Sequence, residues 1–231
     1  DTLGTYLVKL SSRELNHADS QSVNTLLHTI SDFERISDHS VNVLSSAEEI
    51  HAKSIEFSKD AQEELQVLED AVQDILNRTT DAFRKGDLHL ASKVEPLEAV
   101  VNELVRAIKA HHIARLQAGA CTIEYGFVLD DLLTNYERIA DHCSNIAVAM
   151  IEVSEDRFDT HEYLNHIKNG ESPSFEKRYE RYRGRYTFEP CRCTGAEKII
   201  IAGLSPVKWA GTCGTSQVSA CLFGGSYDLY C

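Results

Sequence analysis

The strongest constraint on this chain is a nine-residue segment that occurs twice, with the copies 103 positions apart. Residues 34–42 read ERISDHSVN (the first signature) and residues 137–145 read ERIADHCSN (the second signature), so six of nine positions are identical. Five of those six identities are polar or charged. A helix that was repeated only to fill a core would keep its apolar spacing and let its polar face vary. The repeat therefore indicates that the polar face carries the function.

From about residue 20 to residue 153, apolar residues recur at alternating spacings of three and four, as in Leu129, Leu132, Tyr136, Ile139 and Cys143. This period is typical of helices that pack along a shared apolar seam, with charged residues on the outside. The sequence therefore predicts an all-α fold of antiparallel three-helix bundles.

Local signals mark the ends of these helices. Ser58 can cap a helix that begins near Lys59, while Gly86 can end that helix and Asp87 can start the next, so the two must fold back antiparallel. Pro96 interrupts a continuing seam, so either the helix kinks there or it starts at Glu95 after a short lead-in turn.

These signals divide the chain into four parts. Residues 59–153 form a complete three-helix bundle, and residues 1–58 form the C-terminal part of a first, truncated repeat whose missing helices are expected upstream of Asp1. Residues 154–186 are expected to form peripheral short helices or a strap. Residues 187–231 hold five of the seven Cys and six of the 12 Gly, and we interpret them as an unstructured or non-native extension rather than a zinc site.

Charge and hydropathy exclude some classes of partner. The formal net charge is −13, which disfavours nucleic acid and anionic membrane surfaces. No apolar run approaches the roughly 18–20 residues that span a bilayer, and nothing at the N-terminus resembles a signal peptide.

Each signature carries two carboxylates four residues apart, which are neighbours about 6 Å apart on a helix surface and repel by a few tenths of a kcal/mol. A hard or borderline cation between them would replace this repulsion with coordination. Their helical position is the border between the apolar seam and water. The predicted metal ligands are Glu34, Asp38, Glu137 and Asp141, with Asp130, Asn42 and Asn145 as additional candidates.

Two carboxylates do not close a metal site, so neighbouring helices, waters or anions must complete it. Candidate side chains on the helical hairpin are Asp74, Asp81, Glu95 and Glu98. The signature histidines, His39 and His142, point nearly 100° away from the adjacent Asp, so we assign them to supporting or salt-bridging roles.

These residues resemble a known family. Paired Glu-x-x-x-Asp motifs on the third helix of tandem three-helix bundles look like the PhoU family of phosphate-uptake regulators. The longer segments 32–39, 121–124, 134–145 and 158–164 look like one branch of it, the C-terminal domain of bacterial sodium/phosphate cotransporter family proteins. The resemblance covers about residues 1–186.

The resemblance implies a non-catalytic domain that modulates phosphate uptake by a sodium/phosphate symport system. It implies iron or zinc ions at Glu34 with Asp38 and at Glu137 with Asp141. It also implies an upstream transmembrane transporter domain and a place at the cytoplasmic face of the plasma membrane; whether phosphate joins the metal cluster stays open. The exposed seam of an incomplete bundle favours a homodimer or other homo-oligomer.

Two other interpretations compete with this one. The acidic flank could dock a basic loop of a partner, which makes the chain a helical interaction module without metal. A carboxylate-bridged dimetal oxidase is disfavoured, because such sites use Glu-x-x-His pairs on facing core helices. The histidines of this chain instead point away from the acidic pairs.

Overall fold

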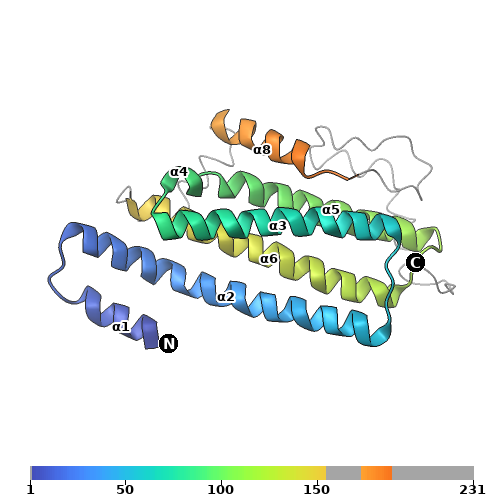
Figure 1. The fold of residues 1–231 in the computed structure, drawn as a ribbon, viewed down its shortest axis with the longest axis horizontal. Coiled ribbons are helices and arrows are strands. Elements are labelled where there is room, and N and C mark those ends of the chain that lie inside the picture. The colour runs from blue at the N-terminus through green and yellow to red at the C-terminus, as the bar shows by residue number, and fades with distance from the viewer. Residues whose placement is uncertain (1, 155–172, 189–231) are drawn as a thin grey trace.

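The computed structural model describes residues 2–154 and 173–188, and within these ranges the chain forms helices and no strand. The all-α fold is therefore as predicted (Figure 1). The helices are α1 (Thr2–Ser11), α2 (His17–Lys53), α3 (Lys59–Lys85), α4 (Leu88–Ala91), α5 (Val94–Gln117), α6 (Ile123–Ser154) and α8 (Pro173–Arg185).

The predicted helix ends are confirmed by their capping geometry. Ser58 Oγ accepts a hydrogen bond from the backbone N–H of Ala61 at 3.3 Å and caps α3. Gly86 ends α3 in the left-handed conformation (φ 63°), which glycine adopts without steric cost. Asp87 caps the next helix by accepting from the N–H of Leu90 at 2.9 Å. These three residues set the antiparallel turn between α3 and the segment that follows.

Pro96 lies in the first turn of α5, which begins at Val94. A proline there loses no intrahelical hydrogen bond, because the first N–H groups of a helix have no partner within it. The four-residue helix α4 forms the lead-in. The helix therefore starts after a short lead-in turn rather than kinking at Pro96, and it begins at Val94, one residue before the predicted Glu95.

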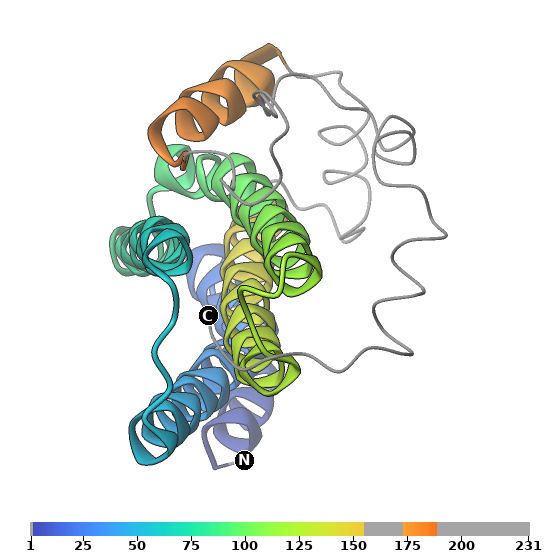
Figure 2. The same ribbon diagram turned by 90° about the vertical axis from the view of Figure 1, so that its right-hand side faces the viewer.

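Helices α3, α5 and α6 surround the main core (Figure 2). Their fully buried side chains include Leu68, Ile75, Leu97, Ile108 and Ile146, each 0 % exposed. Helix α6 runs antiparallel to α5 and to α2 (Figure 1). Helix α2 packs more extensively against α6 than against any other helix, so the two helices that carry the signatures lie side by side.

Helices α1 and α2 form a two-helix unit beside the bundle, with α1 folded back on the first part of α2. The side of α2 that turns away from α6 exposes Val41 and Leu44, each 59 % exposed. Among the helices in the described ranges, none combines the length and the apolar character needed to cross a membrane.

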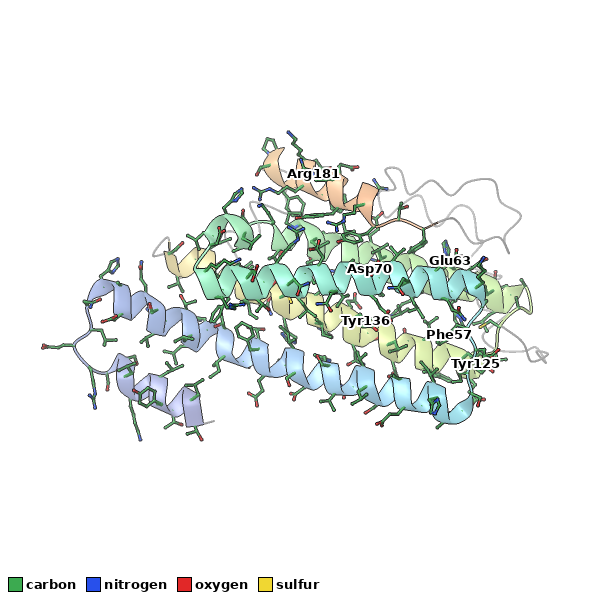
Figure 3. The ribbon with its side chains drawn as sticks, viewed as in Figure 1. Phe57, Glu63, Asp70, Tyr125, Tyr136 and Arg181 are labelled. Atoms are coloured by element: carbon green, nitrogen blue, oxygen red, sulfur yellow. The ribbon has the colours of Figure 1, made fainter. Side chains whose placement is uncertain are left out.

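Helix α8 lies on the outer face of α5, and its exposed Arg181 is on the edge of the molecule opposite α2 (Figure 3). Tyr179 donates to Glu103 at 2.6 Å and Tyr186 donates to Asp74 at 2.7 Å, with Tyr182 buried between them. This helix falls within the peripheral segment predicted for residues 154–186. Residues 155–172 and the predicted tail from 189 onward lie outside the described residues.

Candidate functional site

The two signatures meet across the antiparallel pair of α2 and α6. His142 Nδ1 donates to Asp32 Oδ1 at 2.8 Å, and Asn145 Nδ2 donates to the same oxygen at 3.1 Å. On the other half, Asn135 Oδ1 accepts from His39 Nδ1 at 2.9 Å and from Asn42 Nδ2 at 3.2 Å. The His and Asn that the two signatures share therefore contact the opposite helix, and Asn42 and Asn145 direct their amide groups into this contact.

The acidic pairs lie on a different face of the same two helices. Tyr136 on α6 donates to Glu69 on α3 at 3.0 Å, and Phe33 on α2 packs against Phe83 on α3, with ring centroids 4.8 Å apart. The carboxylates of each pair follow these aromatic residues by one and five positions, which places them about 100° to 140° around the helix. Both pairs therefore lie away from the side of α2 and α6 that packs on α3, the side on which Tyr136 (labelled in Figure 3) lies.

The second acidic pair has a neighbouring helix. Two contacts fix the register of α5 against α6: Ser144 donates to Glu95, and Lys109 forms an ion pair with Asp130 at 2.8 Å. In an antiparallel pair, this register places Glu98 level with Asp141 and Asn102 level with Glu137. Glu95, Glu98, Asn102 and Lys109 share one face of α5, because their spacings are three, four and seven residues.

This α5 face offers oxygen donors. Glu98 is buried (7 % exposed) and accepts from the amide of Asn102. The Oδ1 atom of Asn102 is buried and has no hydrogen-bond partner. A buried acceptor without a donor is uncommon and calls for a ligand, an ion or a water. Asn102 is not among the residues predicted from the sequence, although it lies one helical turn after the candidate Glu98.

The second pair is not assembled around a cation as it stands. Asp141 is 3.4 Å from Arg138, and Asp130 is held by Lys109. Across the ranges that the structure describes, no three side chains of His, Cys, Asp or Glu converge well enough to hold a metal ion. Metal binding at Asp141 would therefore require its carboxylate to turn from Arg138.

The first acidic pair is more open. Glu34 and Asp38 are both exposed, whereas Glu137 and Asp141 are half-buried. In the described part of the chain, no helix flanks Glu34 and Asp38 in the way that α5 flanks the second pair.

The other shell candidates from the sequence have partners elsewhere. Asp74 forms an ion pair with Arg78 at 2.9 Å and accepts from Tyr186, and Asp81 forms an ion pair with Lys85 at 2.8 Å, so neither carboxylate is directed at the acidic pairs. Glu95 accepts from Ser144 inside the α5–α6 contact. Glu98 is the candidate whose place on α5 suits the second pair.

The donor set around the second pair suits a cation. Glu98, Asn102, Glu137 and Asp141 offer carboxylate and amide oxygens, which hard and borderline cations prefer. The unpartnered Oδ1 of Asn102 is an independent sign of an unfilled interaction. The first pair offers two carboxylates, too few for a closed site.

A separate buried polar group lies where α5 turns into α6, and sequence reasoning did not identify it. Glu64 (2 % exposed) accepts from Arg115 through both oxygens at 3.0 Å and from His111 at 2.7 Å. The adjacent His112 lies against Gly126, and its Nε2 has no hydrogen-bond partner. Burial, followed by the nearby Arg115 charge, lowers the pKa of His112 to about 4. Removing one member of this group would leave an unbalanced buried charge, and none of these hydrogen bonds reaches the signatures.

The fold and the duplicated acidic signature thus define a helical-bundle protein with paired carboxylate motifs on its two longest helices. Comparison with known proteins gives a more specific class: residues 65–150 match the family model described as PhoU domain. The chain is also similar to the phosphate-specific transport system accessory protein PhoU homolog 1 of Thermotoga maritima. That similarity is 26 % identity over 149 residues, which cover 63 % of this chain and 62 % of the relative.

The chain is therefore PhoU-like, and it spans less than two thirds of the relative's length. The matched segment runs from Leu65 in α3 to Met150 in α6 and includes the second signature. No solved structure matches the chain.

Proposed function

We propose that this chain is a regulatory PhoU-like domain of a sodium-dependent phosphate transporter and that it modulates phosphate uptake. The observation that carries the proposal is the PhoU match over residues 65–150, which contains the second Glu-x-x-x-Asp motif. The relative from Thermotoga maritima is a phosphate-specific transport system accessory protein, which supports the same process. The sodium/phosphate branch rests on the longer motif segments, such as residues 32–39 and 134–145.

The acidic pairs are the proposed sensing sites of this domain, and iron or zinc is the proposed ligand. At the second site, Glu137 and Asp141 from α6 and Glu98 and Asn102 from α5 would hold the ion, which would neutralise the clustered carboxylates. At the first site, Glu34 and Asp38 would need donors from beyond the described residues, from water or from a bound anion such as phosphate. The second site is therefore expected to bind metal more tightly.

The proposed partners follow from the surfaces. The domain would act at the cytoplasmic face of the plasma membrane, beside a transmembrane transporter domain of the same protein. The exposed apolar side of α2, with Val41 and Leu44, is the surface through which we expect self-association.

Metal analysis tests the ligand assignment. Protein purified without chelator should contain iron or zinc, measured by mass spectrometry of the elements. Asp38→Ala combined with Asp141→Ala should lose the bound metal and keep the helical circular dichroism signal. Of the two single variants, Asp141→Ala should lose more, because Asp141 has the α5 donors beside it. Unfolding should shift by no more than about 0.5 kcal/mol, since neither side chain is in the core.

Asp131→Ala is the matched control, because Asp131 is an exposed acid on α6 outside the acidic pair. It should leave the metal content unchanged. Unchanged metal in the double variant would show that these carboxylates are not ligands.

A second candidate function, the metal-free interaction module, is favoured by one observation. Asp141 already accepts a cationic side chain, Arg138, at 3.4 Å, so this acidic flank can pair with basic groups. Protein that contains no metal, and that takes up none when iron or zinc is added, would select this alternative.

A further inference from the structure

The His and Asn of the signatures are explained by a contact that the proposed metal sites do not use. We propose that Asp32, His39, Asn42, Asn135, His142 and Asn145 form a two-fold symmetric clasp that positions both acidic pairs. This inference rests on the proposed function for the role of the acidic pairs. The clasp itself rests on the contacts between α2 and α6.

The symmetry is visible in the residue numbers. Asn135 follows Asp32 by 103 positions, which is also the offset between the two signatures. In each half, a His and an Asn from one helix donate to one side-chain oxygen of the other helix, at 2.8 and 3.1 Å on Asp32 and at 2.9 and 3.2 Å on Asn135. Equivalent residues of the repeat therefore make equivalent contacts.

The local two-fold axis passes between the two histidines. The rings of His39 and His142 are stacked, with centroids 5.6 Å apart and an angle of 24° between the planes. In an antiparallel helix pair, two residues at equivalent positions of the repeat can stack on each other only close to the two-fold axis that relates the helices. The axis therefore relates the whole of the first signature to the second.

This arrangement fixes the rotation of each helix about its own axis. His39 and His142 directly follow Asp38 and Asp141 in the sequence. Each helix takes part in all four hydrogen bonds of the clasp, so it cannot turn its acidic pair toward or away from water without breaking them. Because the two halves are related by the axis, both acidic pairs are held on the same side of the α2–α6 pair, away from α3. The clasp residues thus act as positioning residues for the metal sites.

The two halves differ in one chemical respect. Asp32 brings a carboxylate to its half, and the side chains of Asp32 and His142, which share this hydrogen bond, are only 17 % and 14 % exposed. Asn135 brings a neutral amide to the other half. Charge-assisted hydrogen bonds are stronger than neutral ones, so the Asp32 half should hold more firmly.

Exchanging these two residues tests the symmetry. Asp32→Asn alone should lower the urea midpoint of unfolding and weaken zinc binding by about tenfold, the lower end of the effect of residues that orient metal ligands. Asp32→Asn combined with Asn135→Asp moves the carboxylate to the other half, where His39 replaces His142 as its partner. The exchange should return the urea midpoint to that of the wild type. It should also restore the zinc affinity to within about twofold of the wild-type value. Asp131→Asn removes the same charge from α6 outside the clasp and should change neither measurement.

The outcomes are separable. An exchanged protein that is as impaired as Asp32→Asn would overturn the symmetric clasp. The exchange could restore the urea midpoint while the zinc affinity is the same in all variants. That result would overturn the positioning role. If the wild type binds neither zinc nor iron, the proposed metal function and the positioning role both fail. In that case the urea midpoints of the exchange still decide whether the symmetric clasp exists.

Discussion

Helices α2 and α6 carry the same signature in different surroundings. Helix α6 is enclosed by α3, α5 and α2, whereas α2 contacts mainly α6. At positions 103 residues apart, Ser144 and Ala147 on α6 are 6 % and 1 % exposed, while Val41 and Leu44 on α2 are each 59 % exposed. Small residues stand where neighbouring helices approach α6, and larger apolar residues stand where the described chain leaves α2 uncovered.

The difference shows which positions depend on packing and which do not. The positions that are identical in both helices include those that contact the opposite helix, such as His39 and His142, and those of the acidic pairs. The three positions that differ are exposed on α2 and buried on α6: Ser37 against Ala140, Ser40 against Cys143 and Val41 against Ser144. The polar face of the signature is thus set by the helix pair and the proposed metal sites, and the apolar face is set by the other helices present.

The largest effect expected from this comparison is on stability. Ile139 and Ile36 are the same residue at equivalent positions, but Ile139 is 3 % exposed and Ile36 is only partly buried. Ile139→Ala should lower the free energy of unfolding by about 3 kcal/mol, because the change leaves a cavity in a closed core. Ile36→Ala should cost about 1 kcal/mol, because its site is partly open to water. Urea unfolding measures both values, and equal costs would contradict the difference in enclosure.

A smaller effect on the free energy of unfolding is expected from the buried His112 at the corner between α5 and α6. The α1–α2 unit has no equivalent of this residue, since α1 contains no histidine. The pKa of His112 is lowered to about 4 by burial and by Arg115, so the folded state keeps this ring neutral. The unfolded chain takes up the proton first as the pH falls below about 6.5. The free energy of unfolding should therefore fall between about pH 6.5 and pH 4, on the order of 2 kcal/mol from this residue.

His112→Gln should flatten that part of the pH profile, measured by urea unfolding at pH 7 and at pH 4.5. His89→Gln is the control, because His89 is exposed and its replacement should leave the profile unchanged. If the profile of His112→Gln were as steep as that of the wild type, burial of His112 would not be the source of the pH dependence.

Much of the fold could be predicted from local sequence signals. Ser58, Gly86 and Asp87 marked helix ends correctly because capping depends on residues within one turn. The helical period placed α3, α5 and α6 for the same reason. The choice between a kink and a late start at Pro96 could not be made, because both keep the apolar seam continuous.

The site was harder to predict than the fold because it depends on which helices pair. A helical wheel placed the acidic pairs on the border of the core, but it could not show that His142 would meet Asp32 from 110 residues away. Asn102 was missed for the same reason, since its relation to Glu137 arises from the register of α5 against α6. Glu64 and Arg115 formed no recognisable motif, because a buried ion pair has no fixed sequence spacing.

The exposed side of α2 gives the smallest expected effect on the stability of the monomer. Val41→Glu combined with Leu44→Glu should change the free energy of unfolding by no more than about 0.5 kcal/mol, because both side chains are exposed. The same variant should weaken self-association at least about tenfold in sedimentation velocity, because two charges would have to be buried in the interface. Ser22→Glu combined with Gln73→Glu adds the same charge at exposed positions elsewhere and should leave self-association intact. If both double variants associate like the wild type, the α2 face is not the surface through which copies meet.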